Sequence, residues 1–195
     1  MHEICVLDGL SSKELQELYQ VSRKRIYQKN EMVFEAQEVL KYLYVLIQGQ
    51  IGVQEDQEDG SRSLMTIISR PMDCFGEVYL LLEEPLPLSA MAMKESEVLL
   101  IEKKYIDQIP KLSANLNTIL AYKAFRLTQK MRIMMKDSLR EKLMTYLRQH
   151  RDVQLKRYEL AEYLGVSRPA LSKEISKMQD ENLIYMDKNG KLWVK

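Results

Sequence analysis

Between residues 26 and 101 the chain consists of short apolar runs that glycines such as Gly49, Gly60 and Gly76 separate. Short runs rich in β-branched and aromatic residues, bounded by turn formers, are typical of β-strands. The expected strands are Lys41–Ile47, Gln50–Gln54, Leu64–Ile68 and a buried closing strand at Val98–Ile101. Glu58–Gly60 is expected to form a hairpin tip. Strands at this spacing predict a compact β-barrel or roll.

A short helix is predicted ahead of these strands. Ser11 can accept a hydrogen bond from the Glu14 amide while the Glu14 carboxylate reaches back to Ser11, which is the reciprocal pattern of a capping box. Leu10 and Leu15 are placed to pack across this cap. The helix should end near Gln20.

A helical period replaces the strand pattern beyond Pro110 and continues to about Met135. Its apolar residues recur at alternating intervals of four and three, the spacing of a coiled-coil seam. They are Leu120, Ala124, Leu127, Met131 and Met134. Such a stripe needs a surface to pack on, either the chain's own β-domain or a second copy of the chain. Because the stripe is narrow and close to a heptad, we favour a homodimer.

The last third of the chain predicts helices joined by a tight turn. A helix over Leu139–Gln149 follows a candidate hinge at Asp137-Ser138. A second helix over Leu155–Leu164 ends at Gly165, which can adopt the positive φ of a helix terminus. Ser167 then caps a third helix. This helix–turn–helix arrangement places the first turns of its last helix in the DNA major groove.

That last helix is expected to bury an apolar side formed by Ala170 or Leu171, Ile175 and Met178. Its residues expected to contact DNA are Ser167, Arg168, Pro169, Ser172, Lys173 and Lys177. Pro169 fits the first turn, where a missing amide costs nothing. An arginine there can bind guanine O6 and N7 together, whereas Ser172 and Lys177 suit phosphate. The alternative is an ordinary solvated surface, which we disfavour because turn, cap and charge agree.

A hairpin wing is predicted at the end of the chain. Leu183–Met186 and Leu192–Val194 flank Asp187–Gly190, and Asn-Gly is the strongest short hairpin signal. Lys188 at the tip is positioned to contact phosphate. Trp193 is expected to pack in the core.

Composition supports a polyanionic partner for the C-terminal part. From Leu139 to Lys195 there are 12 basic and 8 acidic residues, a net charge of +4, whereas residues 1–138 hold 17 basic and 20 acidic residues, a net charge of −3. An acidic N-terminal part and a basic C-terminal part indicate that the C-terminal part contacts nucleic acid.

Other classes of protein are disfavoured. The apolar runs are too short to span a bilayer and the first residues lack the features of a secretory signal, so we expect a cytoplasmic protein without a membrane partner. Two cysteines, Cys5 and Cys74, and two histidines favour neither a disulfide framework nor a metal site. We find no phosphate-cradling glycine loop and no plausible serine–histidine–acid set. We therefore expect no catalytic residues and no enzyme activity.

The segment Gly165–Glu174, followed by Met178 and Glu181–Ile184, closely resembles the helix-turn-helix of the Crp/Fnr family of transcription regulators. The front half also resembles that family over its early β-roll hairpin, its ligand-binding loop and its last strand; these segments are Leu43–Leu46 with Gly49–Ile51, Phe75–Glu77 and Ser96–Leu100. The resemblance implies an α+β fold with an N-terminal double-stranded β-helix of the cyclic-nucleotide-binding type, a long dimerisation helix and a C-terminal winged helix-turn-helix.

We expect the sensor or effector domain over residues 1–110, the dimerisation helix over 111–136 and the DNA-binding domain over 137–195. The resemblance implies a homodimer that binds a two-fold symmetric operator in double-stranded DNA, with RNA polymerase as a further partner. Arg168 and Lys173 match base-contacting positions. Family members often carry an acidic residue where this chain has Pro169, so the operator sequence does not carry over.

The candidate effector pocket departs from the cyclic-nucleotide binders. Its residues are Phe75, Gly76, Glu77, Leu88 and Ser89. In those binders an arginine before the serine neutralises the cyclic phosphate, and Leu88 stands there in this chain. A buried phosphate would lack its cation. We therefore expect no cyclic nucleotide cofactor and a small-molecule effector of unidentified kind.

An alternative function keeps the sensing role without DNA binding. In that hypothesis the winged helix serves as a protein-interaction surface. The basic residues Arg168 and Lys173 on the expected outer face favour the DNA-binding regulator instead.

Overall fold

The computed structural model describes residues 4–57, 62–150 and 155–195. The chain divides into two compact units, one ending at Tyr122 and the other covering Lys123–Lys195. The expected hairpin tip at residues 58–60 lies outside the described residues. The division falls inside one long helix, so the boundaries that the sequence predicted at residues 110 and 136 stay a prediction.

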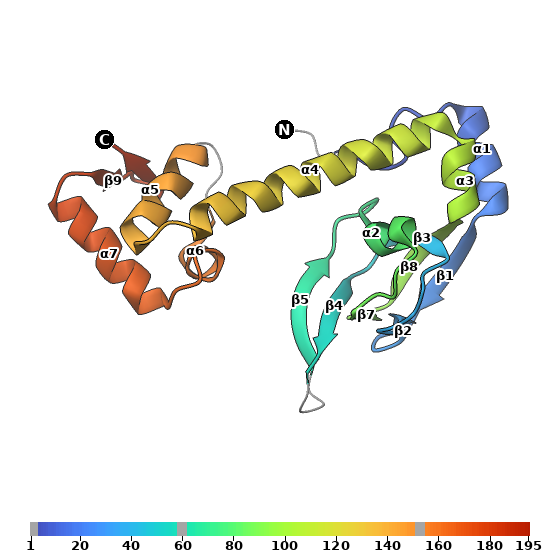
Figure 1. The fold of residues 1–195 in the computed structure, drawn as a ribbon, viewed down its shortest axis with the longest axis horizontal. Helices are drawn as coiled ribbons and strands as arrows, with labels where there is room; N and C mark the ends of the chain where they lie inside the picture. The colour runs from blue at the N-terminus through green and yellow to red at the C-terminus, as the bar shows by residue number, and fades with distance from the viewer. Residues whose placement is uncertain (1–3, 58–61, 151–154) are drawn as a thin grey trace. The chain divides into compact units, whose positions relative to one another are not determined.

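The first unit is a β-roll made of two four-stranded antiparallel sheets (Figure 1). One sheet has the order β1-β8-β3-β6, and its strands are Arg23–Tyr27, Ser96–Glu102, Tyr42–Gln48 and Cys74–Phe75. The other has the order β2-β7-β4-β5, and its strands are Met32–Phe34, Leu88–Ala92, Ile51–Asp56 and Arg62–Ile68. The predicted α+β fold with an N-terminal β-roll is confirmed.

The closing strand β8 organises the first sheet because it pairs with β1 on one side and β3 on the other. Val98, Leu99, Leu100 and Ile101 are all buried there, as expected for a strand covered on both faces. Three helices accompany the strands: α1 over Ser12–Val21, α2 over Glu77–Leu82 and α3 over Lys103–Gln108. The capping box of α1 is present, with the Ser11 amide 2.7 Å from Glu14 Oε2 and the Glu14 amide 3.2 Å from Ser11 Oγ.

The long helix α4 covers Pro110–Met134, close to the expected span. In its first half, Leu112 and Leu116 are buried in the core of the β-roll and Leu120 packs against it. Further along, Leu127 and Met131 are 61% and 54% exposed. Of the predicted apolar stripe, Leu120 therefore packs on the chain's own β-domain, and Ala124, Leu127, Met131 and Met134 are exposed.

The second unit holds three helices and a hairpin around one core. They are α5 over Leu139–Gln149, α6 over Arg157–Tyr163, α7 over Arg168–Asp180, β9 over Ile184–Met186 and β10 over Leu192–Val194. The sequence placed the start of α6 at Leu155, which was wrong. Lys156 is extended, and its amide donates to Glu159 Oε2 at 2.8 Å, so the helix begins at Arg157.

Among the described residues, no helix is both long enough and apolar enough to cross a membrane.

Candidate nucleic-acid interface

The turn between α6 and α7 fixes where the last helix begins. Gly165 has a φ of +67°, as the sequence predicted, and the Val166 amide donates to the Ala161 carbonyl at 3.0 Å. Ser167 Oγ accepts a hydrogen bond from the Ala170 amide at 3.3 Å. A left-handed glycine followed by a capping serine ends one helix and starts the next within three residues.

Helix α7 has one buried face and one exposed face. Leu171, Ile175 and Met178 are buried in the core of the second unit, and Ala170 is exposed. Every residue that the sequence assigned to DNA contact is exposed: Ser167, Arg168, Pro169, Ser172, Lys173, Lys177 and, on the wing, Lys188. The structure thus brings six of the seven onto one helix and its cap, with a basic character suited to phosphate and base edges.

An ion-pair network that the sequence did not reveal joins α5 to α7. Arg140 Nε lies 2.8 Å from Glu174 Oε1, and its terminal nitrogens lie 2.6 and 3.0 Å from the two carboxylate oxygens of Glu181. The hydrogen bonds from Arg140 hold the pKa of the Glu181 carboxyl below its usual range. We call these three side chains the Arg140 clamp.

The wing is held by one carboxylate. Asp187 Oδ1 accepts hydrogen bonds from the amides of Asn189 and Lys191, both at 2.9 Å, and Oδ2 accepts one from Trp193 Nε1 at 3.0 Å. The Lys191 ammonium lies 4.6 Å from the centre of the Trp193 ring. Lys188 is exposed at the tip of this turn.

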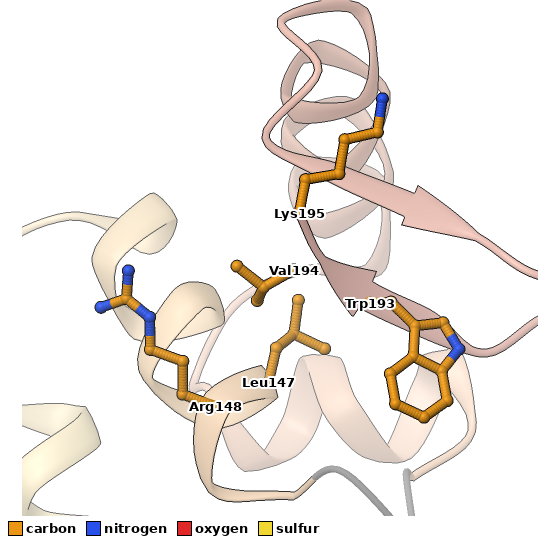
Figure 2. Close-up of a pocket in the computed structure, with 5 residues that line it drawn as sticks. All are labelled: Leu147, Arg148, Trp193, Val194 and Lys195. Carbon is orange, nitrogen blue, oxygen red and sulfur yellow. The ribbon is translucent and has the colours of Figure 1, made fainter.

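Trp193 also lines a groove of about 460 Å³ in this unit, with Leu147, Arg148, Val194 and Lys195. Figure 2 shows the Leu147 and Val194 side chains between Arg148 and Trp193. The sequence assigned Trp193 to core packing and did not reveal the groove, because its walls come from α5 and β10, far apart in the chain.

The candidate effector residues lie on three elements, β6, α2 with its N-cap, and β7. Phe75 is buried on β6 and its ring stacks on Tyr44, while Gly76, with a φ of +77°, is the N-cap of α2 and Glu77 is buried in that helix's first turn. An added Cβ at Gly76 would lie 2.7 Å from Leu40 Cδ1, so an apolar side chain closes over this turn.

Leu88 and Ser89 lie on strand β7 of the other sheet. Leu88 is partly buried and Ser89 is 1% exposed. Within the described ranges, no atom is placed to hydrogen-bond the buried Ser89 Oγ. Gln54, which pairs with Ser89 across the β4–β7 ladder, has a buried Oε1 in the same condition. A buried polar atom without a partner is costly, which is a reason to expect a ligand or water there.

No group of three or more His, Cys, Asp or Glu side chains that could hold a metal ion occurs in residues 4–57, 62–150 and 155–195. In the described residues neither Cys5 nor Cys74 forms a disulfide, and burial raises the pKa of the Cys5 thiol.

Two family models match the chain. Residues 24–111 match the cyclic nucleotide-binding domain, and residues 133–195 match the Crp-like helix-turn-helix domain. The cyclic AMP receptor protein of Thermus thermophilus is 24% identical over 188 residues, which cover 91% of this chain and 87% of that protein.

Solved structures share the fold. The Thermus thermophilus catabolite activator protein has a TM-score of 0.56 at 22% identity, over 97% of this chain and 93% of that one. The c-di-GMP responsive global regulator CLP of Xanthomonas campestris has a TM-score of 0.57 at 17% identity, over 94% of this chain and 98% of that one.

The wing should loosen in acid because of Asp187. The hydrogen bond from Trp193, followed by those from the Lys191 and Asn189 amides, lowers the pKa of Asp187. A lowered pKa means that the stabilising contribution is complete above the ordinary carboxyl value of about 3.9 and is lost as the pH falls below it. Trp193 is the only tryptophan of the chain, so its fluorescence should change as the pH falls below about 3.9. Asp187→Asn should abolish this transition; identical titration curves would contradict the assignment.

Proposed function

The chain belongs to the Crp/Fnr family of transcription regulators, and on this premise we propose that it acts as a homodimer that binds a specific operator in double-stranded DNA. A transcription regulator is not a class of enzyme. We place its action in the cytoplasm, where a bacterial operator is accessible, and RNA polymerase is the further partner that the resemblance suggests.

The observation that carries the DNA-binding proposal is the division of α7 into two faces. Because Leu171, Ile175 and Met178 are buried, Lys173 and Lys177 on the opposite side face outward, and Arg168 is exposed in the first turn of the helix. Arg168 is the first residue of α7, so its guanidinium can reach a base edge while Lys177, further along, meets the backbone. Under the alternative hypothesis of a protein-binding winged helix, nothing would require exposed basic residues at these positions.

The dimer proposal rests on the open part of the α4 stripe. One side of the helix exposes four apolar residues: Ala124, Leu127, Met131 and Met134. Contact of these side chains with water is unfavourable, and a second surface that covered them would remove this free-energy cost. A second copy offers the same stripe, and a two-fold pair of winged helices would match half-sites about one helical turn apart. Leu120 is partly buried against the β-roll, so we expect it to contribute less to the interface than the four exposed residues.

The effector proposal is a small molecule other than a cyclic nucleotide. Two of the relatives described above are named for different nucleotides, cyclic AMP and c-di-GMP, so the shared fold does not fix the ligand. A phosphate beside Leu88 would find no cation on that side chain, while the Ser89 hydroxyl offers a buried hydrogen-bonding group. The residues present therefore do not fit a cyclic phosphate.

Arg168→Ala should lower affinity for an operator selected from random duplexes by about 5- to 150-fold, since a bidentate arginine–guanine contact contributes about 1–3 kcal/mol of discrimination. Lys177→Ala should instead weaken binding to all sequences and reduce the salt dependence by about one ion. Gel-shift titrations at several salt concentrations separate the two effects. A wild-type chain that prefers no duplex over competitor DNA would overturn the proposed function.

Leu127→Glu should split the dimer because it buries two like charges in the proposed interface, at a cost of about 2 kcal/mol or more. The dissociation constant should rise at least about 30-fold in sedimentation equilibrium. Phe125→Glu is the matched control, since Phe125 is 57% exposed on the opposite side of α4. Equal effects of both substitutions, or a wild-type monomer, would exclude this interface.

Cyclic AMP and c-di-GMP should neither bind the purified chain in calorimetric titrations nor change its operator affinity. The reason is the missing cation at Leu88, which leaves a buried phosphate unneutralised. Saturable binding of either nucleotide would refute this part of the proposal without touching the DNA-binding part.

A further inference from the structure

Arg140 and Glu181 both sit where local helix electrostatics disfavour them. Arg140 lies in the first turn of α5, and Glu181 is the C-cap of α7. The helix dipole disfavours a cation at the first position and an anion at the second, by about 0.3–1 kcal/mol each. Residues that break a local rule are expected to serve the tertiary structure or the function.

The geometry of the Arg140 clamp shows what these residues do instead. The guanidinium engages both oxygens of Glu181 and one oxygen of Glu174. Glu174 lies in the middle of α7 and Glu181 at its end, so one side chain of α5 holds α7 at two points about 10 Å apart along the axis. Two attachment points restrict both sliding and rotation of a helix.

The clamp side chains are only partly exposed, at 33% for Arg140, 21% for Glu174 and 37% for Glu181. Partial burial and a bidentate geometry make such a network stronger than an isolated surface pair. Leu171 and Ile175 hold α7 against the core by apolar contacts. Because the hydrophobic effect is not directional, such contacts tolerate small shifts of α7 along its axis. The charged contacts are directional.

We propose that Arg140 is a positioning residue for DNA recognition, which sets the placement of α7 through Glu174 and Glu181. This inference rests on the proposed function. Arg168 is separated from Glu174 by six residues, about 9 Å of helix, so Arg140 acts on base recognition through the helix. A base contact requires placement of the guanidinium to well under 1 Å, so release of the clamp should cost discrimination more than general affinity.

The test compares operator and competitor DNA for folded variants. Arg140→Gln removes the clamp, and Arg148→Gln removes the same charge from the exposed C-terminal end of α5 as the matched control. Arg140→Lys keeps the positive charge but loses the planar guanidinium group, which can hydrogen-bond to two carboxylates at once. We expect Arg140→Gln and Arg140→Lys each to reduce the ratio of operator to competitor affinity about fivefold or more, and Arg148→Gln to leave that ratio within about twofold.

A double-mutant cycle identifies the route. Glu181→Gln should lower the ratio on its own, and the pair Arg140→Gln/Glu181→Gln should be no worse than Arg140→Gln alone. Thermal melts followed by circular dichroism confirm that each variant is folded at the assay temperature. If Arg140→Gln is unfolded at that temperature, Glu181→Gln and Glu174→Gln are compared with the wild-type chain instead. Unchanged ratios in folded variants, rescue by lysine, or additive effects would each overturn the positioning role. Failure of the wild-type chain to discriminate between duplexes would instead overturn the proposed function.

Discussion

The burial of one face of α7 is the contact on which the functional interpretation depends. Leu171, Ile175 and Met178 enter the core of the second unit together with Leu143 and Leu147 of α5. Apolar burial of this size fixes which side of the helix meets water, because rotating α7 would expose three large side chains at once. The outward position of Lys173 and Lys177 is a consequence of that packing, whereas Arg168 is exposed because it stands in the first turn of α7.

The same logic divides α4 into two parts. Where the β-roll offers an apolar surface, Leu112 and Leu116 are buried in it, and where that surface ends the stripe continues into solvent. The sequence recorded a continuous heptad-like pattern and could not tell which residues would find a partner within the chain. Leu120, which the sequence assigned to the dimer seam, is partly buried against its own domain, and its place in a seam stays a prediction.

The first unit has the fold of the cyclic nucleotide-binding domain, while Leu88 stands where the resemblance leads us to expect an arginine. Gly76 and Glu77 occupy the β6–α2 turn, and the side-chain oxygens of Ser89 and Gln54, for which the described part of the chain supplies no hydrogen-bond partner, belong to paired residues of one ladder. A β-roll is specified by strand spacing and buried apolar residues, whereas ligand choice depends on single side chains such as Leu88. Related proteins can therefore keep the same fold and bind different ligands.

The sequence by itself determined the capping box at Ser11, the turn at Gly165–Ser167 and the wing, because each depends on residues that are near one another in the chain. It also determined which residues of α7 would face outward, since a helical period converts spacing into direction. Only the tertiary structure decided the start of α6, the partners of Arg140, the groove beside Trp193 and the division of the α4 stripe. These features join residues that are distant in the chain, and pairing across such distances is set by packing that no local pattern encodes.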